Sequence, residues 1–122
     1  MKFFHASRIE NYNSIIKNGL KIGYKSNGYG KKPEHKAIYL YHINNIDIAC
    51  DFIELFGKVD IFQVEVSKSL FPDEDSNIYF WKDSVNKIGT CACKQDIFDI
   101  KFIGRFYTEK DYINWVKDEI YF

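Results

Sequence analysis

Two pairs of polar or aromatic side chains have the spacing of a binding site. His5 and Ser7 lie two residues apart in an apolar run near the amino terminus, and Tyr39 and Tyr41 have the same spacing in a later apolar run. In a β-strand, residues two apart point to the same face. If both runs are strands, they predict the two walls of a slot for a small molecule. A strand histidine also needs hydrogen-bond partners of its own, and these are most often structural.

The cysteines are the other reactive side chains. Cys91 and Cys93 are separated by one residue, and Cys50 stands alone. Structural zinc sites usually combine two ligand pairs, whereas this chain has one cysteine pair and scattered histidines. An odd cysteine count also does not suggest a disulfide framework. We therefore predict cysteines packed as small apolar groups, no metal and a reducing cytoplasmic location.

Composition predicts one domain over residues 1–122. Seventeen basic and seventeen acidic residues cancel, so no overall charge favours nucleic acid or a membrane surface. No apolar run approaches the ~20 residues that span a bilayer, and the amino terminus lacks the pattern of a secretory signal. We expect no membrane association. The aromatic residues, 18% of the chain, are expected to fill the core.

Local patterns predict the order of elements. Apolar runs rich in β-branched and aromatic residues predict strands over 3–7, 37–41, 59–66, 78–81, 88–93 and 98–106. Helical spacing and end signals predict helices over 11–17, 46–56 and 109–119. Residues 21–36 and 69–77 are expected to be loops. The helices are segregated from most of the strands, which favours an α+β domain.

Three short motifs, taken in order, resemble the ADP-ribosyltransferase superfamily. They are Phe4-His5-Ala6-Ser7, then Ile-Ile-Lys-Asn-Gly-Leu at 15–20, then Ala-Ile-Tyr-Leu at 37–40. The chain looks like the branch that carries His-x-Ser/Thr on its first strand and Tyr on its second. That branch includes poly- and mono-ADP-ribosyltransferases, DNA-modifying toxins and RNA 2′-phosphotransferases. The motifs cover residues 3–41, and from 42 to 106 the resemblance rests on element order.

The resemblance implies a fold and a cofactor. The fold is a compact α+β domain in which two small, mostly antiparallel sheets form a cleft with flanking helices, and the cofactor is NAD⁺. His5 would hydrogen-bond a ribose hydroxyl. Ser7, with the backbone of Ala6, would bind the nicotinamide carboxamide. Tyr39 would stack on the nicotinamide ring, a role that Tyr41 could hold instead.

The third catalytic position departs from the family pattern. Active members usually place a glutamate on a late strand, and residues 88–97 contain none. Thr90 or Gln95 could occupy this position, and Asp96 is the nearest carboxylate. Gly28 is a further candidate cofactor contact, although the glycines around it match neither of the common phosphate-binding motifs.

These expectations give one main hypothesis and two alternatives. The main hypothesis is an NAD-dependent mono-ADP-ribosyltransferase that modifies a macromolecule, with protein favoured over nucleic acid, as a toxin or anti-defence factor in phage–bacterium conflict. The first alternative is a non-catalytic binding module on the same fold, which the missing glutamate favours. The second is an RNA 2′-phosphotransferase-like enzyme, which a chain of zero net charge disfavours. The sequence determines neither the acceptor nor the oligomeric state.

Overall fold

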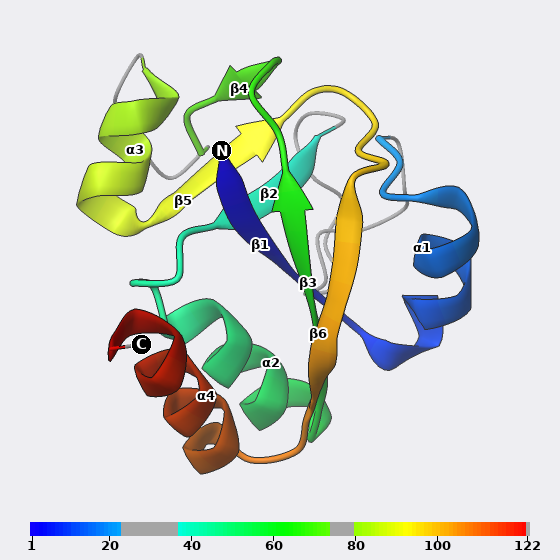
Figure 1. Ribbon diagram of the computed structural model, residues 1–122, viewed down its shortest axis with the longest axis vertical. Helices are drawn as coiled ribbons and strands as arrows, with labels where there is room; N and C mark the ends of the chain where they lie inside the picture. Colours follow the sequence, from blue (N-terminus) through cyan, green and yellow to red (C-terminus); the bar gives the residue numbers. More distant parts are fainter. Residues whose placement is uncertain (23–36, 74–79, 122) are drawn as a thin grey trace.

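Strands and helices follow each other in the computed structural model, which describes residues 1–22, 37–73 and 80–121 (Figure 1). In chain order the elements are β1 (Lys2–Ser7), the short 3₁₀ helix η1 (Ile9–Asn11), α1 (Tyr12–Asn18), β2 (Ile38–Tyr41), α2 (Asp47–Phe56), β3 (Val59–Glu65), β4 (Leu70–Phe71), α3 (Trp81–Ile88), β5 (Thr90–Cys93), β6 (Ile100–Phe106) and α4 (Glu109–Tyr121). The α+β class expected from the sequence is confirmed. None of the helices in these ranges is long and apolar enough to span a membrane.

All six strands form one antiparallel sheet in the order β4-β5-β2-β1-β3-β6. β1 stays in register with β3 from Lys2 to Ser7, and β2 with β5 along its whole length. By contrast, β1 and β2 are in register at one pair, Phe4 and Tyr41. The described strands are therefore a single sheet with a narrow junction in its middle, where the resemblance implies two small sheets.

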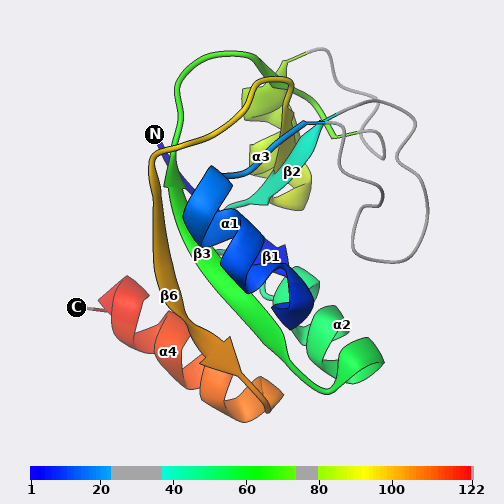
Figure 2. The same cartoon turned by 90° about the vertical axis from the view of Figure 1, so that its right-hand side faces the viewer.

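Two hydrophobic cores lie on opposite faces of this sheet. The α1/α3 core contains Phe3, Ile15, Leu20, Ile38, Leu40, Phe62, Val64, Cys91, Cys93 and Ile97. The α2/α4 core contains Phe4, Ala6, Tyr41, Ala49, Phe52, Ile53, Val59, Ile61, Tyr112 and Val116. Figure 2 shows α1 beside β3 and β6, with α2 and α4 at the lower end of the molecule. Because both faces of β1 are covered, its successive residues Phe3 and Phe4 are both buried.

The expected strand over 78–81 is wrong where the structure describes it. Trp81 begins α3, and Trp81 and Val85 pack against the α1/α3 core. The aromatic residues before the helix have high strand propensity, but the helical period of Trp81, Val85 and Ile88 prevails. As a result β5 starts at Thr90 instead of residue 88. β4 lies inside the segment expected to be a loop, and residues 74–79 are outside the described ranges.

One asparagine joins the ends of two helices. The side-chain oxygen of Asn45 accepts hydrogen bonds from the backbone N–H groups of Asp47 (3.0 Å) and Ile48 (3.4 Å) at the start of α2. Its side-chain nitrogen donates to the carbonyl of Ile88 at the end of α3, at 2.7 Å. Gly89 follows with φ of 72°, and a Cβ there would lie 2.6 Å from that of Asn45. Close approach and positive φ both require glycine at this position.

We expect Asn45→Ala to destabilise the fold by about 1–3 kcal/mol, because the first turn of α2 and the last carbonyl of α3 lose their partner together. Urea unfolding measures this loss. Asn44→Ala is the matched control, since Asn44 is exposed and its backbone N–H donates to His42 Nδ1. Equal unfolding midpoints for the two variants would contradict the role of Asn45.

Candidate functional site

His5 marks the place where β1 and β2 separate. Its Nδ1 lies 2.9 Å from the backbone carbonyl oxygen of Tyr39. Had the ladder continued past the Phe4–Tyr41 pair, that carbonyl would face the backbone of β1. The imidazole of His5 instead donates the hydrogen bond to this carbonyl. The contact lies next to the Phe4–Tyr41 pair, where backbone pairing ends. His5 and Tyr39, two residues predicted for the site, are therefore brought together.

This contact fixes the chemical form of the imidazole. A carbonyl oxygen only accepts, so Nδ1 must carry the hydrogen and Nε2 is then an acceptor in the neutral ring. Burial lowers the pKa of His5 below its usual 6.5, and the bond to Tyr39 opposes that change only in part. His5 is therefore a neutral hydrogen-bond acceptor through Nε2 at neutral pH.

The side chains of His5 and Tyr39 leave their strands on opposite faces. His5 alternates with Phe4 and so shares the face of Phe3, which is in the α1/α3 core. Tyr39 shares the face of Tyr41, which packs in the α2/α4 core. The structure thus joins His5 to the backbone of Tyr39. Tyr41 is buried, and its hydroxyl lies 2.9 Å from that of Tyr112 on α4.

Ala6 and Ser7 lie at the far end of β1. Ala6 is buried in the α2/α4 core. The Ser7 hydroxyl donates to the backbone carbonyl of Arg8 at 3.0 Å and accepts from the side chain of Asn11 at 3.5 Å. In this arrangement Ser7 holds the turn from β1 into η1, on the same face as His5.

An ion pair between a buried carboxylate and an exposed arginine lies next to Ser7 and has no counterpart in the sequence predictions. Asp60 is in register with Ser7 on one side and with Arg105 on the other. Asp60 is fully buried, and its two oxygens accept from Nε and Nη2 of Arg105 at 2.6 and 3.0 Å. This bond to Asp60 also raises the pKa of Arg105. In the sequence, Asp60 precedes Phe62 and Val64 at two-residue spacing, which places a carboxylate on an apolar face of its strand. This pattern could have indicated that Asp60 has a charged partner.

Gln95 and Asp96, the candidates for the third position, are held elsewhere. The oxygen of the Gln95 side chain accepts from the Ser69 hydroxyl at 3.0 Å. Asp96 accepts from the backbone N–H of Ile22 at 2.9 Å and ion-pairs with Lys21 at 3.4 Å. The pKa of Asp96 is lowered, mainly by the bond from Ile22 and then by Lys21. These contacts attach the segment after α1 to the segment before β6.

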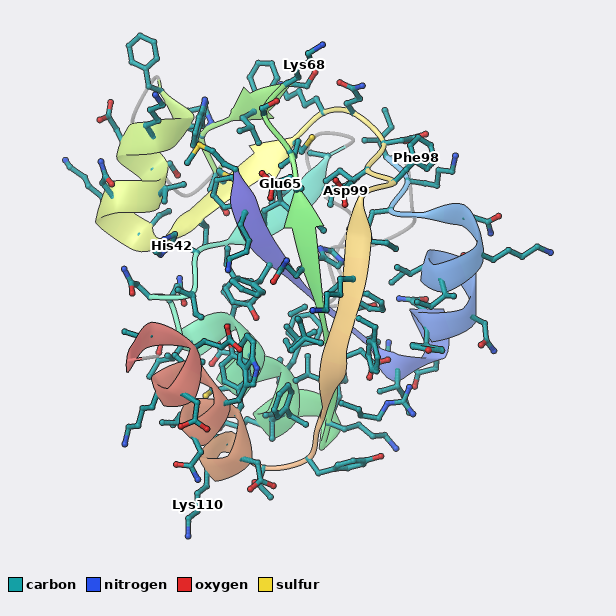
Figure 3. The ribbon with its side chains drawn as sticks, viewed as in Figure 1. His42, Glu65, Lys68, Phe98, Asp99 and Lys110 are labelled. Carbon is teal, nitrogen blue, oxygen red and sulfur yellow. The ribbon has the colours of Figure 1, made fainter. Side chains whose placement is uncertain are left out.

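Phe98 completes this attachment. Lys21 Nζ lies 4.6 Å from the centroid of its ring, and a Cβ on Gly19 would lie 2.9 Å from a ring carbon. Figure 3 shows Phe98 and Asp99 just before β6. Gly19 is followed by a two-way backbone pairing of Leu20 with Ile97, at 2.8 Å in each direction.

The remaining candidates do not join the His5–Tyr39 contact. Gly28 lies outside the described residues. Cys91 and Cys93 are buried in the α1/α3 core, and burial raises the pKa of Cys91 to about 12. Within the described ranges, no three histidine, cysteine or acidic side chains are grouped to hold a metal ion. The cysteine thiols here are packing groups.

In comparisons with known proteins, no family model, no curated protein and no solved structure matches this chain.

The neutral state of His5 predicts acid sensitivity. Unfolded His5 binds a proton near pH 6.5, whereas folded His5 does so only at lower pH. The stabilisation is therefore complete above pH 6.5 and is lost as the pH falls below it. We expect wild type to lose more stability than His5→Asn between about pH 7.5 and 5.5, because asparagine can keep the Nδ1-type donor without titrating. Urea midpoints at the two pH values measure this. A wild-type difference in His5→Asn would contradict the assignment.

The contacts of Asp96 with Lys21 and Ile22 predict that the backbone at Lys21 is protected from proteolysis. We expect Asp96→Asn to speed cleavage by trypsin after Lys21, because the carboxylate that holds Lys21 and Ile22 loses its charge. Mass spectrometry of early digestion products measures the rate at that bond. Asp99→Asn is the control, since the Asp99 side chain is exposed. Equal rates in the two variants would show that Asp96 does not secure the segment.

Proposed function

We propose that the chain is an NAD-dependent mono-ADP-ribosyltransferase that modifies a macromolecular acceptor, with protein favoured over nucleic acid. The observation that carries the proposal is the hydrogen bond from His5 Nδ1 to the carbonyl of Tyr39 at the sheet junction. It joins the two residues that the family resemblance assigns to the nicotinamide ribose and ring. In this proposal the cleft lies where β1 and β2 separate beyond the Phe4–Tyr41 pair, between the two halves of the sheet.

The state of His5 fits a ribose contact. With Nδ1–H committed to Tyr39, Nε2 accepts a hydrogen bond, and a ribose hydroxyl is a donor of the required kind. A neutral imidazole also adds no positive charge beside a cationic nicotinamide, whereas a protonated one would repel it. The lowered pKa of His5 keeps the ring in this neutral form.

Tyr39 supplies the aromatic contact in the proposal. Its strand is held by β5 on one side and by the His5 bond on the other, so its backbone is fixed at the junction. A cationic heterocycle gains from an aromatic face. Bound NAD⁺ would supply an ADP-ribosyl group whose bond to nicotinamide breaks with the electron pair leaving on the ring nitrogen. Because the side chains of His5 and Tyr39 leave on opposite faces, the ligand would have to pass between the two halves of the sheet for His5 to orient the ribose and Tyr39 the ring.

A non-catalytic binding module is the second candidate function. It is favoured by the positions of Gln95 and Asp96, which are bonded to Ser69 and to Lys21 and Ile22. In such a module His5 and Tyr39 would hold the same ligand without transfer. The RNA 2′-phosphotransferase-like alternative has less support, because the chain has zero net charge.

Transfer of labelled ADP-ribose from NAD⁺ to protein, in a lysate or to the chain itself, tests the proposal. We expect His5→Asn to lower the rate by about 100-fold or more, the usual cost of losing one well-placed active-site hydrogen bond. Tyr39→Ala removes the stacking contact and should lower the rate about tenfold or more. His5→Asn is informative because it keeps the donor to Tyr39 while removing the Nε2 acceptor.

Controls separate the candidate functions. His42→Asn, at the far end of β2 (Figure 3), should transfer at the wild-type rate. Free nicotinamide measured by chromatography reports turnover independently of the acceptor. Binding of NAD⁺ without nicotinamide release would indicate the binding module, and undiminished transfer in both variants would refute the site.

A further inference from the structure

Three residues on neighbouring strands form an aromatic row. Tyr39 on β2 is in register with Ala92 on β5, and Ala92 is in register with Phe71 on β4. Paired residues of antiparallel strands point to the same face of a sheet. The methyl group of Ala92 therefore lies between the positions of two aromatic side chains.

The spacing of this row suits one planar ring. Neighbouring strands lie about 4.8 Å apart, so the strands of Tyr39 and Phe71 are separated by about 9.6 Å. Aromatic pairs have centroids about 4.5–7 Å apart, so a ring held between two others needs about 9–14 Å between them. Ala92 is buried and Phe71 is 41% exposed, so a ring would enter as Phe71 rotates about its side-chain torsions.

The main contacts of α2 with the sheet are made to β1 and β3, and those of α4 to β6, away from the strands of this row. In Figure 1 α2 and α4 lie at the bottom, near β1, β3 and β6, while β4 and β5 lie in the upper part. α3 packs on β5, but its Trp81 and Val85 contact the α1/α3 core that contains Cys91 and Cys93. Ala92 alternates with those two cysteines and so lies on the other face.

A cation lies at one end of the row. Lys94 follows Ala92 by two residues on the same side of the strand, about 6.6 Å further along it. Its backbone N–H bonds to Ser69, which extends the pairing of β5 with the β4 segment. Lys94 Nζ lies 4.1 Å from the centroid of the Phe71 ring. Among the residues that the structure describes, no carboxylate forms an ion pair with it.

A hydroxyl without a partner lies at the other end. Thr90 precedes Ala92 by two residues on the same face, and it is buried. Its Oγ1 has no hydrogen-bond partner in the described part of the chain. Buried hydroxyls are nearly always paired, so this one indicates a polar group supplied from outside.

We propose that this row is a nucleotide-binding site. The base stacks between Tyr39 and Phe71 over Ala92, a polar substituent of the base bonds to Thr90, and the phosphate pairs with Lys94. Lysine binds phosphate as a point charge. A neutral base fits better than a cationic ring, because Lys94 already places a positive charge on the Phe71 ring. The site goes beyond the proposed transfer, since it concerns binding alone, although Tyr39 is common to both.

Calorimetric titration with AMP and with adenosine tests the site on the full chain. We expect Phe71→Ala to weaken AMP binding about tenfold or more, the usual effect of losing one base-stacking side chain. Lys94→Gln should weaken binding of AMP and leave that of adenosine unchanged. Phe98→Ala and Lys87→Gln are matched controls, exposed residues outside the row, and should bind AMP as wild type does.

Thr90→Val separates binding from folding. Valine has nearly the shape of threonine and removes the hydroxyl, so we expect unchanged or higher stability to urea together with weaker AMP binding. A variant that merely fails to fold would lose both. Unchanged AMP affinity in Thr90→Val would overturn the assignment of that hydroxyl.

The remaining outcomes show whether the row binds a nucleotide at all, and whether that nucleotide is part of NAD⁺ or a separate molecule. Absence of AMP binding by wild type, or equal affinities for Phe71→Ala and Phe98→Ala, would overturn the proposal. If Phe71→Ala weakens NAD⁺ binding as it weakens AMP binding, the row holds the adenylate half of NAD⁺, and if it weakens AMP binding alone, the row holds a separate nucleotide. Because no transfer is measured, AMP binding that depends on Phe71 stands even if the transferase proposal fails.

Discussion

The pairing of Phe4 with Tyr41 is the constraint on which the rest of the structure depends, because this one in-register pair joins the two halves of the sheet. Side chains of α2 and α4 pack around it, and two aromatic residues of α4 contact it directly. The Phe4 ring meets that of Trp115 edge to face at 5.6 Å, and Tyr41 and Tyr112 bring their hydroxyls within 2.9 Å. Burial raises the pKa of Tyr41 well above 10, so the pair stays un-ionised. Helix α4 thus secures a junction too narrow to be held by backbone bonds alone.

The narrow junction also explains what His5 does. Since β1 and β2 separate after one pair, the Tyr39 carbonyl would lack a partner, and the imidazole provides one. At the opposite end of β1 the neighbouring row carries the buried Asp60, which is paired with the exposed Arg105. A buried carboxylate without its cation is strongly destabilising, so this pair fixes the register of β3 with β6. His5 therefore lies between β3, with which β1 is paired along its whole length, and β2, which separates from β1 after one pair.

Much of the element order could be predicted from the sequence because its signals are local. The alternation over 59–66 predicts a strand, which the structure has at Val59–Glu65. Gly19 and Gly57 predict the ends of α1 and α2, and both ends are confirmed. Sequence patterns place Trp81 in a strand because the aromatic run before it outweighs a helical period of only two turns. Of the candidate site, the sequence named His5 and Tyr39. The strand alternation places Asp60 on a buried face but does not indicate its partner Arg105, which is far away in the chain.

By itself the sequence determined which side chains can do chemistry and in which strands they stand. Only the tertiary structure decided what each of them meets. His5 meets the backbone of Tyr39 and not its ring, and Asp96 holds Ile22 instead of entering the junction. The reason is that a strand's period fixes which residues share a face, whereas the choice of face and the point of separation depend on pairing between distant segments. No local propensity specifies that pairing.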